Sequence, residues 1–174
     1  MFWVALSLLH DRPEKTSQSR LAGMAGVATF MVLLTMLSGG FVAGLKAGHA
    51  FNSFPLMAGK WLPPGYLAVE PVWRNFFETI PTVQFNHRWL AIATYVVVLV
   101  FVARGWQDAI LARYRSALAL FAGVATLQVV LGILTLLLHV PVILGAAHQG
   151  SALLFFTVSL YVVFVSRHTP VGER

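Results

Sequence analysis

The chain has 174 residues, of which 58% are hydrophobic and only 10% are charged. Soluble domains carry about 25% charged residues, so this composition predicts an integral membrane protein that contacts the lipid bilayer. The net charge of +6 does not indicate nucleic-acid binding, because the basic residues cluster between apolar segments, where they set membrane topology. The chain has no cysteine, which excludes disulfides and thiolate metal sites.

The N-terminal segment, residues 1–20, opens with an apolar run that is short for a membrane span. About 20 helical residues are needed to cross roughly 30 Å of hydrocarbon. The run also lacks the positive start and the small-residue cleavage site of a signal peptide. We therefore expect a cytoplasmic segment that is the remnant of a preceding helix, in a fragment or the second half of a longer protein.

Four apolar stretches predict transmembrane helices, at about residues 21–45, 83–103, 116–138 and 144–166. The last two are separated at Pro141, because proline cannot continue a helix. We expect an all-α polytopic protein whose domain, residues 21–168, is an antiparallel up-down four-helix bundle. A loop at 46–81 carries an amphipathic, tryptophan-bearing segment at 72–80, which predicts a short helix at the membrane interface. Residues 169–174 form a tail.

The basic residues predict the orientation of these spans. One side of the membrane would hold most of them, and the other side only Lys46, Lys60 and Arg74 in a long loop. We expect a multi-pass protein of the inner (cytoplasmic) membrane, with both termini cytoplasmic and loop 46–81 periplasmic. The predicted cytoplasmic set is Arg12, Lys15, Arg20, Arg104, Arg113, Arg115, Arg167 and Arg174.

His87 and His148 each fall about four residues, or one helical turn, into a span that runs inward from the outer face. They belong to an internal repeat in which a glycine-containing helix, a loop and a histidine-bearing helix follow one another. Two neutral imidazoles facing each other across a bundle core would make a bis-histidine haem site, and Arg88 would pair with a haem propionate. The alternative is that both histidines only hydrogen-bond to neighbouring helices.

Small residues near both histidines would leave room for a flat macrocycle, although they also let helices approach closely without any ligand. His139 and His49 lie near the outer surface, where an interfacial role is the alternative to contact with the site. Glu78 is an outer-side carboxylate that either approaches the site or stays solvated. No set of catalytic residues is predicted. The small residues are Gly40, Gly44, Gly48, Ala91, Thr94, Gly132, Ser151 and Ala152.

Several motifs in order along the chain resemble the haem A synthase family, in its alphaproteobacterial and mitochondrial form. They are SGGFVAGLKAG (38–48), NSFPLM (52–57), WLPP (61–64), VWRNFFE (72–78), TVQFNHRWLA (82–91) and LGAAHQGSALLF (144–155).

The resemblance implies an eight-helix protein of two similar four-helix halves, of which this chain is similar to the C-terminal half. The family oxidises a methyl group of haem O to the formyl group of haem A for cytochrome c oxidase. The implied partners are haem O synthase, cytochrome c oxidase assembly, an electron donor, and either the missing N-terminal half or a second copy. In this half, His87 and His148 would ligate a haem b.

Two departures matter. The family's other half has a glutamate three residues before its first histidine, where this chain has Gln84, and Asn86 replaces a frequent aspartate. Independent catalysis by this chain is therefore in doubt. Two alternatives stay open: a small bis-histidine b-type cytochrome acting as an electron-transfer or anchor subunit, and a membrane scaffold without haem.

Overall fold

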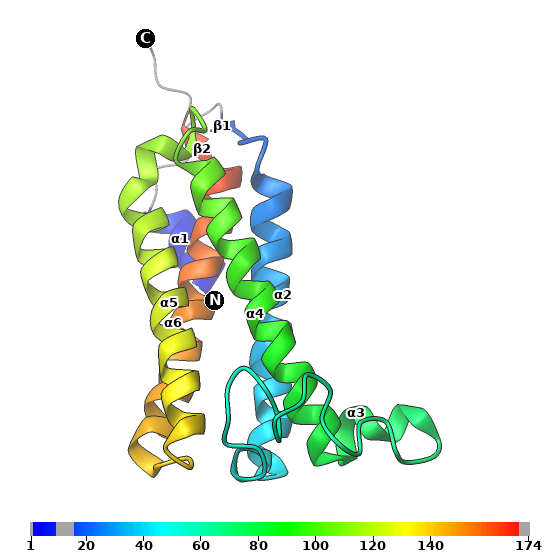
Figure 1. The fold of residues 1–174 in the computed structure, drawn as a ribbon. Helices are drawn as coiled ribbons and strands as arrows, with labels where there is room; N and C mark the ends of the chain where they lie inside the picture. Colours follow the sequence, from blue (N-terminus) through cyan, green and yellow to red (C-terminus); the bar gives the residue numbers. More distant parts are fainter. Residues whose placement is uncertain (1, 10–15, 171–174) are drawn as a thin grey trace.

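The computed structural model describes residues 2–9 and 16–170, and within them four long helices dominate the molecule (Figure 1). These helices are α2 (Ala22–Gly44), α4 (Ile80–Gly105), α5 (Arg115–Leu137) and α6 (Val142–Arg167). All four are long and apolar enough to cross a membrane, which suits lipid because a helix satisfies its own backbone hydrogen bonds. The prediction of an all-α polytopic membrane protein is confirmed.

The four long helices run alternately up and down beside one another (Figure 1). Helix α2 packs against α4 and α6, and α5 packs against the same two helices. Helices α4 and α6 are therefore diagonal to each other and run in the same direction. We call the end that holds residues 46–79 the loop end, and the opposite end the terminal end.

Two helices begin earlier than the predicted spans. Helix α4 starts at Ile80 with Pro81 in its first turn, and α6 starts at Val142 directly after Pro141. A proline in the first turn loses no intrahelical hydrogen bond, and its fixed φ suits the helix. Both prolines thus start helices, and each histidine lies about two turns inside its helix.

Short elements complete the fold. Strand β1 (Thr16–Ser17) pairs antiparallel with β2 (Thr169–Pro170), which ties the start of α2 to the end of α6 at the terminal end. Helix α1 (Phe2–Leu9) packs against α6. The remaining elements are the single turns η1 (Ala47–His49), η2 (Val72–Arg74) and η3 (Leu111–Tyr114) and the short helix α3 (Asn75–Glu78).

The hydrophobic core lies in the terminal half of the bundle. Phe121 on α5 meets Phe101 of α4 and Phe155 of α6, with ring centroids 6.2 and 5.5 Å apart. In the loop half, no residue of α2 beyond Val32, of α5 beyond Ala125 or of α6 before Phe155 is buried. Tightly packed apolar side chains therefore hold the terminal half together, whereas in the loop half the buried residues of the long helices lie on α4.

The described basic residues expected on the cytoplasmic side gather at the terminal end. Arg20 precedes α2, Arg104, Arg113 and Arg115 lie around the α4–α5 connection, and Arg167 ends α6. Arg12, Lys15 and Arg174 lie outside the described residues. The chain is a multi-pass membrane protein, and the assignment of its terminal end to the cytoplasm stays a prediction.

Candidate functional site: a diagonal histidine pair

His87 on α4 and His148 on α6 lie about two turns from the loop end of their helices. Because the two helices are diagonal and parallel, the histidines stand at similar depth on opposite sides of the bundle axis. This depth exceeds the single turn predicted from the sequence.

Each histidine ring packs against a glycine of the neighbouring helix. A Cβ added at Gly39 of α2 would lie 3.2 Å from Cε1 of His87, and one at Gly132 of α5 would lie 3.0 Å from Cε1 of His148. Both distances are shorter than ordinary carbon contacts of about 3.5–4.0 Å. Any larger residue at these positions would therefore displace the ring. In both halves of the internal repeat, a glycine of one helix thus contacts the histidine of the next helix.

His87 is also held by polar groups. Its Nδ1 lies 2.7 Å from Oγ of Ser38 on α2. One turn earlier, the Thr35 hydroxyl pairs with the buried Thr94 hydroxyl of α4 at 2.8 Å. Small polar side chains thus join α2 to α4 beside the ring.

His148 has a different environment. Its Nδ1 is buried and has no hydrogen-bond partner within the described part of the chain. Its backbone carbonyl accepts hydrogen bonds from Nε2 of Gln128 at 3.1 Å and from Oγ of Ser151 at 3.0 Å. The helix backbone around His148 is therefore fixed while the ring nitrogen is not.

Arg88 follows His87 in sequence but faces the loop. Its side chain is only 7% exposed. Nη1 donates to the carbonyls of Ser53 at 2.8 Å, Pro55 at 2.9 Å and Leu56 at 3.2 Å. Its guanidinium also lies over the Phe54 ring, 5.7 Å from the centroid. Arg88 thus holds the loop segment 48–56, which we call the strap, against α4; the predicted contact with a propionate stays a prediction.

The strap is pinned to more than one helix. Gln84, 4% exposed, donates from Nε2 to the Phe51 carbonyl at 3.1 Å. Asn52 donates from Nδ2 to the Gly48 carbonyl at 2.7 Å and to the Leu136 carbonyl of α5 at 2.8 Å. The strap therefore crosses from α4 to α5 over the loop end, outside the histidine pair.

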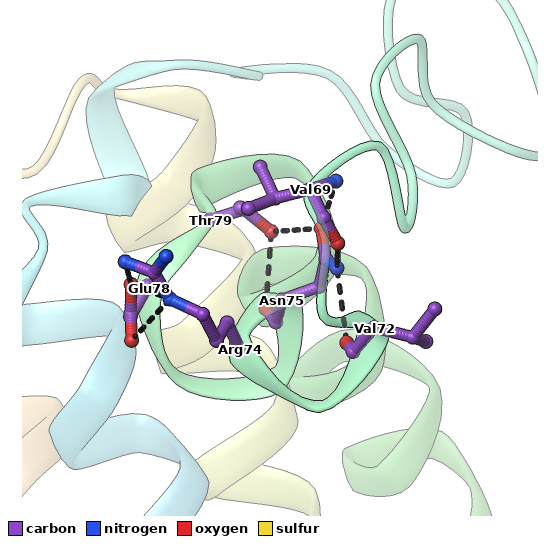
Figure 2. Close-up of polar contacts among 6 residues, drawn as sticks. All are labelled: Val69, Val72, Arg74, Asn75, Glu78 and Thr79. Carbon is purple, nitrogen blue, oxygen red and sulfur yellow. Dashed lines mark hydrogen bonds and ion pairs between the residues drawn. The ribbon is translucent and has the colours of Figure 1, made fainter.

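Glu78 belongs to a separate arm. It forms a bidentate ion pair with Arg74 at 2.6 Å, and both side chains are exposed. Figure 2 shows Asn75 at the centre of this arm, where its side chain bonds the backbone of Val69 and Val72. The Arg74 guanidinium, through its hydrogen bond and its charge, lowers the pKa of the Glu78 carboxyl. The Glu78 carboxylate therefore stabilises the arm through its ion pair with Arg74.

The other predicted small residues divide in two groups. Gly132 does face a histidine, but Gly40 and Gly44 have nothing within 4 Å of an added Cβ, and Gly48 instead meets Val140 of the α5–α6 turn. The spacing of Gly40, Gly44 and Gly48, four residues apart, indicated a different face of α2. It therefore did not point to Gly39 and Ser38, which contact His87. His49 and His139 are exposed.

These features define a class of protein: a four-helix membrane bundle in which two diagonal helices carry a histidine pair near one end. The chain belongs to the cytochrome oxidase assembly protein family (COX15-CtaA), whose model matches residues 1–160.

Curated relatives cover nearly the whole chain. It is similar to the heme A synthase of Nitrosospira multiformis, with 44% identity over 93% of this chain and 46% of that protein. It is also similar to heme A synthase COX15 of Mus musculus and of Homo sapiens, each 40% identical over 97% of this chain. The matches cover 41% and 42% of those two proteins, so the chain spans less than half the length of these relatives. No solved structure matches the chain.

Proposed function

We propose that this chain is the haem b-binding C-terminal half of a haem A synthase, with His87 and His148 as the axial ligands of the haem iron. The relatives that cover nearly all of it are named heme A synthase. The observation that carries the haem site is the pairing of diagonal histidines, each beside a glycine that leaves its ring unobstructed.

The residues present fit such a group. The Ser38 contact engages Nδ1 of His87, which leaves Nε2 as the ligating nitrogen, and metal-bound histidines usually have their other ring nitrogen hydrogen-bonded in this way. The loop halves of α2, α5 and α6 contain no residue that is buried as a whole, and the apolar cluster that holds the bundle together lies in the terminal half. A group bound between the histidines would therefore not displace that cluster. A bound haem would supply a reversible one-electron redox centre.

Each part of the chain then has a task. Helices α4 and α6 present the two imidazoles, and α2 orients one of them through Ser38. The strap covers the loop end. Arg88 places a positive charge at this end. Its Nε makes no hydrogen bond with the described residues, and its Nη2 makes one contact of 3.4 Å with the Phe51 carbonyl. These two nitrogens are the donors left for a propionate.

In the full protein, this half would support oxidation of the haem O methyl group to the formyl group of haem A during cytochrome c oxidase biogenesis. Its partners would be a four-helix N-terminal half or a second copy, an electron donor, haem O synthase and the oxidase assembly machinery. The protein would lie in the inner membrane with the terminal end in the cytoplasm, and residues 21–168 would form the haem-binding domain.

A second function is favoured by Gln84. The position that resembles the family's glutamate carries a buried amide here, which cannot accept or release a proton as a carboxylate does. A chain working alone would then be a bis-histidine b-type cytochrome that transfers electrons or anchors another subunit.

The test is to purify the chain in mild detergent, record its reduced-minus-oxidised absorption spectrum and identify the haem by pyridine extraction. A low-spin b-type spectrum is expected, and it should be lost in His87→Ala and in His148→Ala. The exposed His139 serves as control, and His139→Asn should keep the spectrum because asparagine tolerates the positive φ of that position. If both alanine variants retain the spectrum, the ligand assignment is wrong.

Co-expression with an N-terminal four-helix half separates the two functions. Formation of haem A by the pair, but not by this chain alone, is expected for half of a synthase. A haem-loaded chain that never supports haem A formation in any such pair would favour the cytochrome.

A further inference from the structure

The Ser38 hydroxyl stands between the ring of His87 and a carbonyl of its own helix. Its Oγ lies 2.8 Å from the Thr35 carbonyl and 2.7 Å from Nδ1 of His87. A serine hydroxyl has one proton and two acceptor lone pairs, whereas a carbonyl oxygen only accepts. The proton is therefore donated to the Thr35 carbonyl, and the oxygen accepts a hydrogen bond from a protonated Nδ1.

The backbone of α2 also leaves room for the ring beside this hydroxyl. Gly39 lets the ring lie against α2, since an added Cβ would stand only 3.2 Å from Cε1. Helix α2 thus presents the Ser38 hydroxyl and the open surface of Gly39 to this imidazole.

We propose that Ser38 is a positioning residue that fixes His87 in its Nδ1-protonated tautomer, so that Nε2 carries the lone pair. The tautomer is a property of this chain without any ligand. What Nε2 binds rests on the proposed function.

The proposal makes the two histidines unequal. His148 has no comparable partner, since its Nδ1 is buried and unpaired among the described residues. The tautomer of a neutral histidine is set by the hydrogen bond that its other nitrogen makes. His87 is therefore set for ligation before any ligand arrives, while His148 must select its tautomer on binding.

Nitrogen NMR of the haem-free 174-residue chain, labelled with ¹⁵N-histidine in detergent micelles, tests this directly. The His87 signals are assigned by their loss in His87→Gln. In the unmodified chain, Nδ1 should appear as the protonated nitrogen and Nε2 as the unprotonated one. Ser38→Ala should give a mixture of the two tautomers, and Ser38→Thr, which keeps a hydroxyl, should restore the single form.

Thr35→Val is the matched control. It removes a hydroxyl one turn away that pairs with Thr94, but it leaves the Ser38 hydroxyl and the Thr35 carbonyl in place. Its His87 signals should match those of the unmodified chain. A predominantly Nε2-protonated His87 in the unmodified chain, or identical signals in Ser38→Ala, would overturn the proposal.

Haem titration gives a second readout. Loss of an outer hydrogen-bond partner typically weakens metal binding about 10- to 100-fold, so Ser38→Ala should bind haem correspondingly more weakly and with an altered midpoint potential. Failure of the proposed function would appear as no haem binding by the unmodified chain, and the NMR result would still decide the role of Ser38. Haem binding and potential unaffected by Ser38→Ala would contradict that role even in a haem-binding chain.

Discussion

Replacing Gly132 with alanine should weaken haem binding without destabilising the helix that carries it. The new Cβ would lie 3.0 Å from Cε1 of His148, about 0.5–1 Å inside an ordinary carbon contact. Without haem the imidazole can turn to another rotamer, but a ring bound to iron cannot. The cost therefore falls on the haem-bound state.

The expected size follows from what overpacking costs in well-packed sites, about 1–3 kcal/mol. At 1.4 kcal/mol for each tenfold change, this corresponds to about 5- to 140-fold weaker haem binding. Gly39→Ala should have a smaller effect on His87, because its Cβ would lie slightly farther away, at 3.2 Å. Alanine is also a better helix former than glycine by about 0.5–1 kcal/mol, so the midpoint of thermal unfolding of the haem-free chain should not fall.

Absorbance titration of purified variants with haemin, beside thermal unfolding of the haem-free chains, measures both effects. Gly123→Ala is the control, because Gly123 lies on the same helix and nothing lies within 4 Å of its added Cβ. Equal haem affinity in Gly132→Ala and the unmodified chain, or an equal loss in Gly123→Ala, would refute the reasoning.

Three further predictions concern the loop end. Arg88→Gln should speed amide hydrogen exchange of the strap about tenfold or more, because hydrogen bonds to a charged donor contribute roughly 1.5–3 kcal/mol. Arg74→Gln, which changes the separate arm, should leave exchange of the strap unchanged. Equal protection of the strap in both variants would contradict this prediction. Asn52→Leu should likewise loosen the strap from α5, seen as faster exchange around residue 52 with α4 unaffected. The lowered pKa of the Glu78 carboxyl means that its ion pair stabilises the arm above the ordinary value of 4.5 and is lost as pH falls through the lowered value. Protection of the amides in residues 72–79, taken relative to the intrinsic exchange rate at each pH, should therefore fall in acid. Glu78→Gln should remove that pH dependence, and an unchanged dependence would rule out Glu78 as the titrating group.

The four membrane helices could be predicted from apolar length because lipid offers backbone groups no alternative partner, so each span must satisfy its own hydrogen bonds. Their starts were less accurate. Pro81 and Pro141 were treated as ends of non-helical segments, but each is compatible with the beginning of a helix. This placed His87 three residues and His148 two residues deeper in their helices than predicted.

The surroundings of the histidines could not be read from spacing alone. The glycines at intervals of four mark one face of α2, but whether that face meets α4 depends on the rotation of α2 about its axis. The structure instead turns Gly39 and Ser38 toward His87. Arg88 shows the same limit, because its carbonyl partners lie more than thirty positions earlier in the chain, in a loop without regular secondary structure.

By itself, the sequence determined the membrane class, the four spans and the placement of His87 and His148 near the same end. These depend on local quantities, namely apolar length and distance from a helix end. Tertiary structure alone decided that the two histidines stand on diagonal helices, that each meets a glycine, and that Ser38 hydrogen-bonds only one of them. Those features depend on the packing order and rotation of helices, which contacts between distant segments establish.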